Sequence, residues 1–140
     1  MRDVTLTLPM LPDMELTASK TAGAMGEHIR MSPDKIDEVQ MAVIEATVNA
    51  FEHSGAADRQ VWIHFQVLGP ETDPRGLEIT VRDRGIGIPP EKLNKNRVQD
   101  DRRSLPRKRG HGLRIISGLM DEVDIQSDQE GTTIIMRKMR

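Results

Sequence analysis

The longest uninterrupted helical pattern in the chain, residues 33–53, most limits how it can fold. Ser32 provides a hydroxyl at the N-cap position and Pro33 takes the first helical position, a pairing typical of helix starts. Gly55 provides the stop signal. Apolar residues occupy most of the circumference beyond Met41, so a helix over these residues must be covered by other elements.

One side of this helix carries a polar pair, Glu45 and Asn49, spaced four residues and therefore one turn apart. A solvated stripe is the ordinary interpretation of such a pair. A pair that faces a cleft is the alternative, since an amide oxygen suits Mg²⁺ beside phosphates and a carboxylate can accept a hydroxyl proton. The pair alone leaves both interpretations open. The core is expected on another side, formed by Ile36, Val39, Val43, Ala46 and Ala50.

The rest of the chain alternates between strand and helix patterns. Helical spacing predicts a helix over 13–30, although Gly23 and Gly26 weaken it, and a later helix that starts directly after Gly110 and Gly112. Alternating apolar residues predict strands over 4–8, 59–68, 77–83, 121–128 and 132–139. This order predicts one α+β domain over 1–140, a two-layer sandwich with helices on one face of a mixed, mostly antiparallel sheet.

Composition excludes several classes of function. The chain has no cysteine, which rules out disulfides, thiolate metal sites and a cysteine nucleophile. Its formal net charge of −2 gives no reason to expect direct nucleic-acid binding. No apolar run is long enough for a signal peptide or a membrane span, so we expect a cytoplasmic protein that does not contact a membrane.

Two glycine-rich segments carry the remaining polar signals. Asp83 ends a predicted strand before Gly85 and Gly87, where a carboxylate can accept a hydrogen bond from an exocyclic amine such as that of adenine. Further on, Gly110 and Gly112 place free amides at a helix start, a natural site for phosphate. An ordinary turn and an ordinary helix start are the alternatives.

A basic segment and a threonine near the C-terminal end of the sequence complete the set of candidate site residues. Lys108 and Arg109 add positive charge before the glycines, at the end of the basic segment 91–109, which lacks apolar periodicity and is expected to be a long mobile loop. Thr132 follows a glycine at a strand start, where its hydroxyl can reach a base edge or simply belong to a hairpin turn.

Taken in order, the motifs E-x-x-x-N, D-x-G-x-G, G-x-G-L at a helix start and G-T resemble the GHKL ATPase superfamily, which has the Bergerat ATP-binding fold. Within it, the chain is most similar to the bacterial anti-sigma-factor serine/threonine protein kinases. The resemblance covers essentially the whole chain.

The resemblance implies a role for each matching residue. Glu45 would be the general base, Asn49 would coordinate the Mg²⁺ that bridges the ATP phosphates, and Asp83 would hold the adenine amino group. Segment 89–109 would be a mobile ATP lid. The nucleotide would also be contacted by Gly85, Gly87, Arg109, Gly110, His111, Gly112, Leu113 and Thr132, with His111 acting through its backbone amide.

The resemblance also implies partners. Such a kinase sequesters a sigma factor, phosphorylates a STAS-domain antagonist and forms a homodimer, for which residues 1–30 are the expected contact. The alternative is a nucleotide-dependent binding module with little turnover that acts on another regulator. A detached histidine-kinase domain is disfavoured because residues 1–32 are too short for a dimerisation hairpin, and a topoisomerase-type ATPase would need a further domain.

Overall fold

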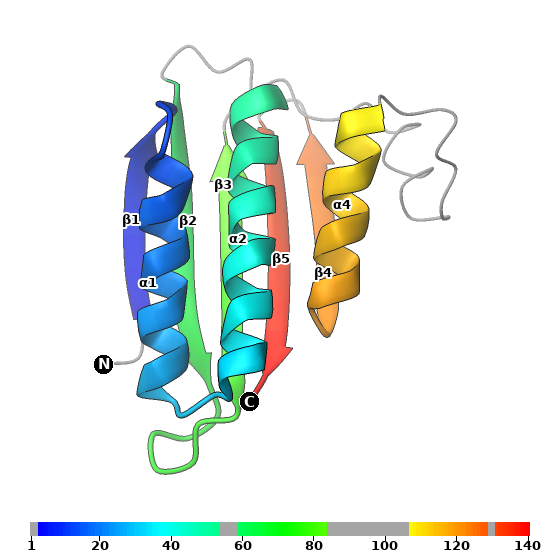
Figure 1. The fold of residues 1–140 in the computed structure, drawn as a ribbon. Helices are drawn as coiled ribbons and strands as arrows, with labels where there is room; N and C mark the ends of the chain where they lie inside the picture. Colours follow the sequence, from blue (N-terminus) through cyan, green and yellow to red (C-terminus); the bar gives the residue numbers. More distant parts are fainter. Residues whose placement is uncertain (1–2, 54–58, 84–106, 129–130) are drawn as a thin grey trace.

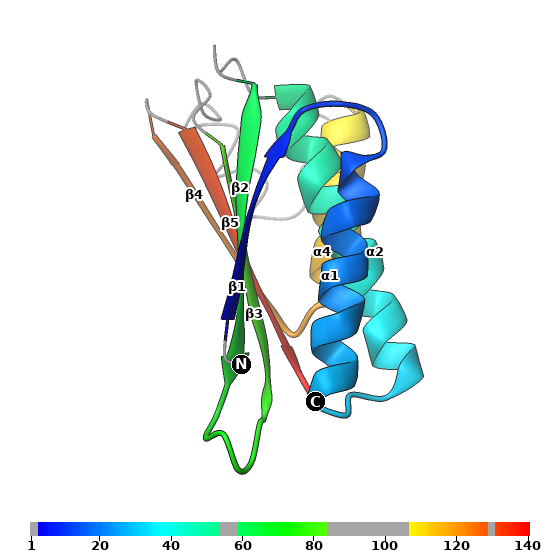
Figure 2. The ribbon, with the colours of Figure 1, turned by 90° about the vertical axis from the view of Figure 1, so that its left-hand side faces the viewer.

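The computed structural model describes residues 3–53, 59–83, 107–128 and 131–140, and arranges them in two layers (Figure 1). Three helices lie on one face of a sheet of five strands, and the other face carries no helix among these residues (Figure 2). The elements in chain order are β1 (Asp3–Pro9), α1 (Met14–His28), α2 (Pro33–His53), β2 (Gln60–Leu68), β3 (Gly76–Asp83), α4 (Arg107–Leu119), β4 (Glu122–Asp128) and β5 (Gly131–Met139).

The strand order is β1-β2-β3-β5-β4, and every neighbouring pair is antiparallel. The predicted α+β sandwich is therefore confirmed, while the described sheet is antiparallel throughout rather than mixed. The connection through α4 gives β4 the same direction as β3, but β5 lies between them and keeps each contact antiparallel (Figure 1). The edge strands of this sheet are β1 and β4.

Alternation along each strand separates a buried face from an open face. In β2, Val61, Ile63, Phe65 and Val67 are buried beneath the helices, whereas Trp62 on the opposite face is exposed. Full burial of a side chain such as Phe65 contributes about 1.5–3 kcal/mol, so this row is a major part of the core. None of the described helices is long and apolar enough to cross a membrane.

Helix α2 begins as the sequence predicts. The Ser32 hydroxyl accepts a hydrogen bond from the Lys35 amide at 3.4 Å, and the Ser32 carbonyl accepts one from the Ile36 amide at 2.9 Å. The expected core stripe is buried, apart from Ile36, which is half-buried. Gly55, the predicted stop, lies outside the described residues.

Helix α1 packs closely against α2 because of the two glycines that weakened its prediction. A Cβ atom added to Gly26 would lie 2.8 Å from Cγ1 of Ile36, too close for an ordinary contact. At Gly23 the Gln40 side chain fills the corresponding space, and its amide donates to the Ser19 carbonyl at 3.2 Å. The glycines therefore cost helix propensity but permit the two helices to approach.

Helix α4 begins earlier than the sequence predicts. Its first residue is Arg107, so Gly110 and Gly112 lie within the helix instead of preceding it. Glycine lowers helix propensity without forbidding a helix, and packing of the apolar residues that follow outweighs that cost. Only residues 107–109 of the expected lid, 89–109, belong to the described part of the chain, and they form the first turn of α4.

Candidate functional site

The side of α2 that carries Glu45 and Asn49 faces the junction of β5 and α4. At 3.6 residues per turn, Glu38 lies on the same side of the helix as these two residues. Oε1 of Glu38 is 3.3 Å from Nζ of Lys138 on β5, and the same Nζ donates to the carbonyl of Leu119, the last residue of α4, at 2.6 Å. These contacts orient the whole side, including the polar pair further along α2.

Burial distinguishes the two members of this pair. Asn49 is only 7% exposed, whereas Glu45 is half-buried and open to solvent on one side. The Asn49 side chain has no hydrogen-bond partner in the part of the chain that the structure describes. A buried polar group without a partner costs about 1–3 kcal/mol, so such a group points to a bound ligand or water. The solvated-stripe interpretation is therefore wrong for Asn49.

Across the sheet, a second group of polar side chains faces the helices. Asp83 on β3 pairs in register with Thr132 on β5, which pairs with Ser127 on β4. Asp83 is 6% exposed and Thr132 is 7% exposed. On the other side of Asp83, the same row continues with the buried Val61 of β2. The row on the helix-facing side is therefore apolar on β2 and polar on β3, β5 and β4.

Hydroxyl groups in this row are joined to each other. Oγ of Ser127 and Oγ1 of Thr132 are 3.2 Å apart, within hydrogen-bonding distance. The neighbouring Thr133 faces the open side of the sheet instead. Of the two threonines, only Thr132 can therefore contribute to a site between the sheet and the helices, which agrees with the choice made from the sequence.

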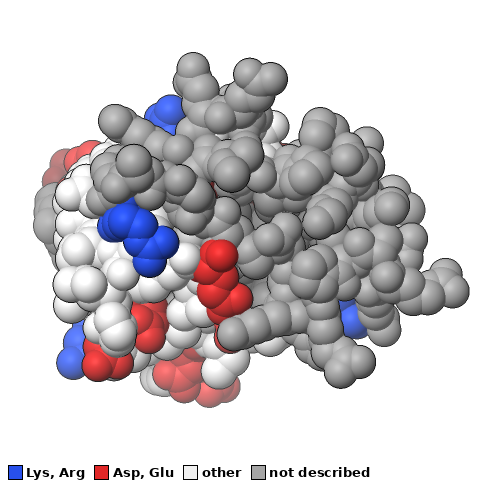
Figure 3. Space-filling model, turned by 90° about the horizontal axis from the view of Figure 1, so that it is seen from above, with Lys and Arg blue, Asp and Glu red and all other residues white. Residues whose placement is uncertain are grey.

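All of these residues lie toward one end of the molecule. The end of α2, the end of β3, the start of β5 and the start of α4 meet there (Figure 1). Viewed toward this end, acidic and basic side chains are interspersed over the described surface (Figure 3). The described residues of this side therefore create no broad field of one sign.

Helix α4 contributes its first turns to the same end. The amides of the N-cap and of the first three residues of a helix have no intrahelical acceptor, and in α4 those three residues are 107–109. Gly110 is the fourth residue of α4, where the i→i−4 hydrogen bonds begin, and Gly112 lies two residues further inside. Leu113 is 5% exposed and packs into the core, which anchors this end of α4. The side chains of Arg109 and His111 lie outside the described part of the structure.

The structure thus brings together four of the predicted residues, Glu45, Asn49, Asp83 and Thr132, with the start of α4 at the same end. Gly85 and Gly87 lie outside the described residues. Ser127 was not predicted as a site residue. The sequence feature that could have identified Ser127 is the short hairpin between β4 and β5, because the register of that hairpin places Ser127 opposite Thr132.

Comparisons with known proteins identify the family of the chain. The profile of the histidine kinase-like ATPase domain family matches residues 8–138. An anti-sigma F factor of Clostridium acetobutylicum is 31% identical, with 89% of this chain and 84% of that relative covered. The serine-protein kinase RsbW of Listeria innocua is 26% identical, with 96% of this chain and 85% of that relative covered.

A solved structure shows the same fold. The crystal structure of the RsbU and RsbW domains of a Mycobacterium tuberculosis protein matches with a TM-score of 0.71 at 18% identity, covering 99% of this chain and 33% of that one. The chain belongs to the histidine kinase-like ATPase domain family, in the group that includes the anti-sigma F factors.

Proposed function

We propose that this chain is an ATP-dependent serine/threonine protein kinase and anti-sigma factor of a bacterial partner-switching system. The observation that carries the proposal is the buried Asn49, which has no partner among the described residues and lies one turn from the accessible carboxylate of Glu45. Phosphoryl transfer requires a positioned metal–phosphate group beside a residue that orients the attacking hydroxyl, and this pair provides both functions.

The donor groups present fit Mg·ATP. No cluster of three or more His, Cys, Asp or Glu side chains in the described ranges could hold a metal by itself. A Mg²⁺ ion at Asn49 would therefore be held by the amide oxygen together with nucleotide phosphates and water, the coordination that Mg²⁺ prefers. The free amides at the start of α4, those of residues 107–109, would contact the phosphates, and Gly110 would let the phosphates approach that turn closely.

The base would be recognised at the strand ends. The Asp83 carboxylate would accept a hydrogen bond from the adenine amino group, and the adjacent hydroxyl pair of Thr132 and Ser127 would support the ring edge directly or through water. A guanine ring presents a carbonyl oxygen in place of that amino group and would leave the buried carboxylate facing an acceptor. Selectivity for adenine over guanine follows.

Catalysis itself would depend on Glu45. When bound, Mg·ATP supplies the phosphoryl group and neutralises the charge on its oxygens. The Glu45 carboxylate would accept the proton of a serine or threonine hydroxyl on the partner protein while that oxygen takes the phosphoryl group and ADP leaves. Because Glu45 is half-buried and not sealed in the core, a partner's hydroxyl can reach it.

The partners are proposed from the relatives, which are named anti-sigma F factor and serine-protein kinase. The chain would sequester a sigma factor and phosphorylate a STAS-domain antagonist, and the two would compete for it according to bound nucleotide and phosphate. We also propose that it acts in the cytoplasm as one ATP-binding domain and forms a homodimer. Light scattering on the purified chain tests the last point, and a monomer at all concentrations contradicts it.

Calorimetric titration with Mg·ATP, Mg·ADP and Mg·GTP tests the nucleotide site. We expect adenine nucleotides to bind selectively and Asp83→Asn to remove the preference over GTP. Asp73→Asn, in the exposed β2–β3 connection, is the matched control and should bind like the wild type. Equal losses for ATP and GTP in Asp83→Asn contradict the adenine assignment. Selective binding with no phosphate transfer to any STAS protein of the same genome would favour the alternative of a sequestering module with little turnover.

A further inference from the structure

Two arginines on the open face of the sheet differ sharply in their surroundings. Arg137 on β5 is held by Glu78 on β3 at 2.7 Å and by Glu122 on β4 at 3.2 Å. The hydrogen bond to Glu78 and the charge of that carboxylate raise the pKa of Arg137 above its usual range. Arg82 on β3 is exposed and makes no hydrogen bond or ion pair within the part of the chain that the structure describes.

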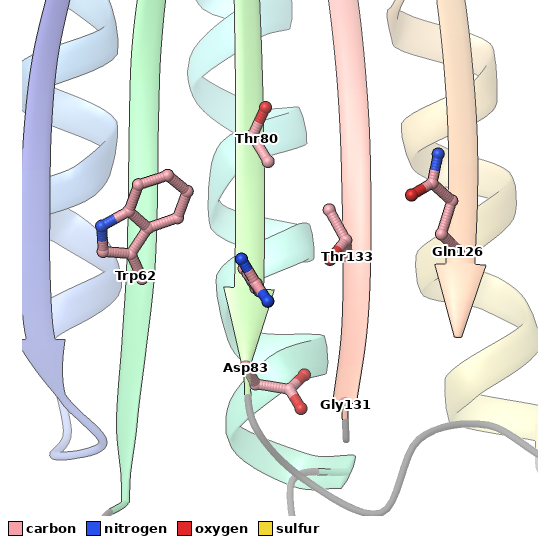
Figure 4. Close-up of a pocket in the computed structure, with 7 residues that line it drawn as sticks. Trp62, Thr80, Asp83, Gln126, Gly131 and Thr133 are labelled. Carbon is pink, nitrogen blue, oxygen red and sulfur yellow. The ribbon is translucent and has the colours of Figure 1, made fainter. Parts of the chain in front are cut away.

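Arg82 lies in a row of side chains that crosses four strands. Its register partners are Trp62 on β2 and Thr133 on β5, and Thr133 in turn pairs with Gln126 on β4. These side chains, with Thr80, line a hollow of about 290 Å³ on the open face (Figure 4). Small-molecule sites have volumes of roughly 300–1,000 Å³, so the hollow is close to the size of a small ring compound.

The tryptophan in this hollow is held in place by its neighbours. The Trp62 and His64 rings are stacked, with centroids 5.9 Å apart and an interplanar angle of 12°. Nε2 of His64 is in turn 3.0 Å from Oδ2 of Asp3 on β1. Trp62 nevertheless remains 39% exposed. A fixed, exposed indole beside an unpaired guanidinium presents one surface for a planar ring and one for an anion.

We propose that this hollow is a second binding site, which takes a small molecule that carries both a planar ring and a carboxylate or phosphate group. The ring packs against Trp62, and the anionic group forms a bidentate pair with Arg82. The hydroxyls of Thr80 and Thr133 line the hollow as further hydrogen-bond donors. Gln126 is oriented by a 3.2 Å hydrogen bond from its amide to Asp124, whose charge limits the anionic end of the ligand to the Arg82 side.

This site opens on the face of the sheet opposite the helices and shares only a border with the nucleotide site, and the proposal does not depend on the kinase function. Consecutive residues of a strand face opposite sides of a sheet. Arg82 and Thr133 therefore lie on the open face, while their neighbours Asp83 and Thr132 face the helices. The two sites share only the end of β3 and the start of β5, where Asp83 and Gly131 also border the hollow.

Trp62 is the only tryptophan in the sequence, so its fluorescence reports directly on the hollow. We would titrate the full chain with phenylacetate and with phenyl phosphate, and separately with inorganic phosphate and benzyl alcohol. We expect a saturable change with the first two probes and only weak, non-saturable changes with the others. The relative strength of the first two distinguishes carboxylate from phosphate recognition.

Variants locate the binding. Arg82→Gln should weaken the aromatic anions by at least about tenfold, as expected when a charged hydrogen-bonded pair is lost. Arg82→Lys should retain part of the affinity, because lysine keeps the positive charge but lacks the planar group that forms a bidentate pair. Arg75→Gln is the matched control, because Arg75 is an exposed arginine that pairs with Asp73 outside the hollow, and it should bind like the wild type.

Further titrations exclude the nucleotide site as the source of the signal. The change should persist in Asn49→Ala and with saturating Mg·ADP present. Displacement by Mg·ADP would place the probes in the nucleotide site and overturn the proposal. A response to benzyl alcohol equal to that for phenylacetate, an equal loss in Arg82→Gln and Arg75→Gln, or no saturable change with any probe would also overturn it.

Discussion

Polar side chains are buried between the helices and the sheet at both ends of the molecule, and one buried residue from each end shows how differently they are hydrogen-bonded. At one end Lys138, 7% exposed, reaches both the Glu38 carboxylate and the Leu119 carbonyl. At the other end the equally buried Asn49 has no side-chain partner among the described residues. The two residues have similar burial and opposite hydrogen bonding.

The difference supports a structural role for Lys138 and our proposal of a ligand-binding role for Asn49. Lys138 fastens α4 to α2 and β5, and its hydrogen bonds offset the cost of burying an ammonium group. No hydrogen bond among the described residues offsets the burial of the Asn49 side chain, and we propose that a bound ligand does so. Loss of Lys138 should therefore reduce stability, whereas loss of Asn49 should reduce binding.

The largest effect should come from Glu45→Gln, which keeps the shape of the side chain and removes its basicity. We expect phosphotransfer to fall by about 10²–10⁴-fold, the usual contribution of a general base, while Mg·ATP affinity stays near that of the wild type. Radiolabel transfer to a STAS-domain substrate and calorimetry measure the two effects. Asp37→Asn, an exposed acid on the same helix, is the control. A parallel loss of ATP binding would contradict the assignment of Glu45 as the base.

Asn49→Ala tests the ligand-dependent end directly. Removal of one metal-bound oxygen should weaken Mg·ATP by about 10–100-fold, in line with hydrogen bonds to charged groups, and should reduce the Mg²⁺ dependence of binding. Unfolding free energy without nucleotide should stay unchanged or rise, because no described partner is lost. Thr47→Ala is the matched control for nucleotide binding, because it removes another buried polar group of α2. The Thr47 hydroxyl donates a hydrogen bond to the Val43 carbonyl at 2.7 Å within the helix. A clear loss of stability in Asn49→Ala would remove the contrast with Lys138.

Lys138→Met should show the opposite behaviour. The Leu119 carbonyl and Glu38 lose their shared donor, which should lower the free energy of unfolding by about 1–3 kcal/mol in urea titrations. Nucleotide affinity of the folded protein should not change. Lys35→Met provides the control, because Lys35 makes an exposed hydrogen bond to the Arg140 carbonyl at 3.0 Å and should contribute about 0.5 kcal/mol or less. Equal effects of the two variants would show that the buried lysine has no special role.

The smallest effect should follow from Ser127→Ala. Loss of the hydroxyl contact with Thr132 should cost about 0.5–1.5 kcal/mol of stability, the usual net value of one hydrogen bond. Since Thr132 remains in place, adenine binding should weaken only slightly. Thr133→Val, on the open face, should leave adenine binding unchanged. A stronger effect of Thr133→Val than of Ser127→Ala would show that the base contacts the open face of the sheet and not the helix-facing side.

Local patterns predicted most of the fold because they are decided by neighbouring residues. The start of α2 follows from Ser32 and Pro33, and each described strand lies within one residue or two of its predicted bounds. The start of α4 was missed because two glycines resembled a boundary, and only tertiary packing shows that the helix continues through them. The order of β5 and β4 in the sheet is likewise a long-range property.

The site was predictable as a set of residue types and not as a geometry. The spacing of Glu45 and Asn49 placed them on one side of a helix, but could not show that this side meets β5 and α4. The burial of Asn49 without a described partner depends on packing across three elements. Ser127 and Arg82 carry no motif, and only the strand register brings each beside its neighbours.

The alternation of residues along β3 and β5 has a consequence for how such a chain can evolve. Substitution of Arg82 or Thr133 changes one surface and leaves the opposite surface intact, so the two can diverge independently. Deletion of a single residue of β3 ahead of Arg82 would instead exchange the faces of the residues that follow, and would place Arg82 against the helices and Asp83 in solvent. The sheet should therefore tolerate many replacements at these positions and almost no change in length.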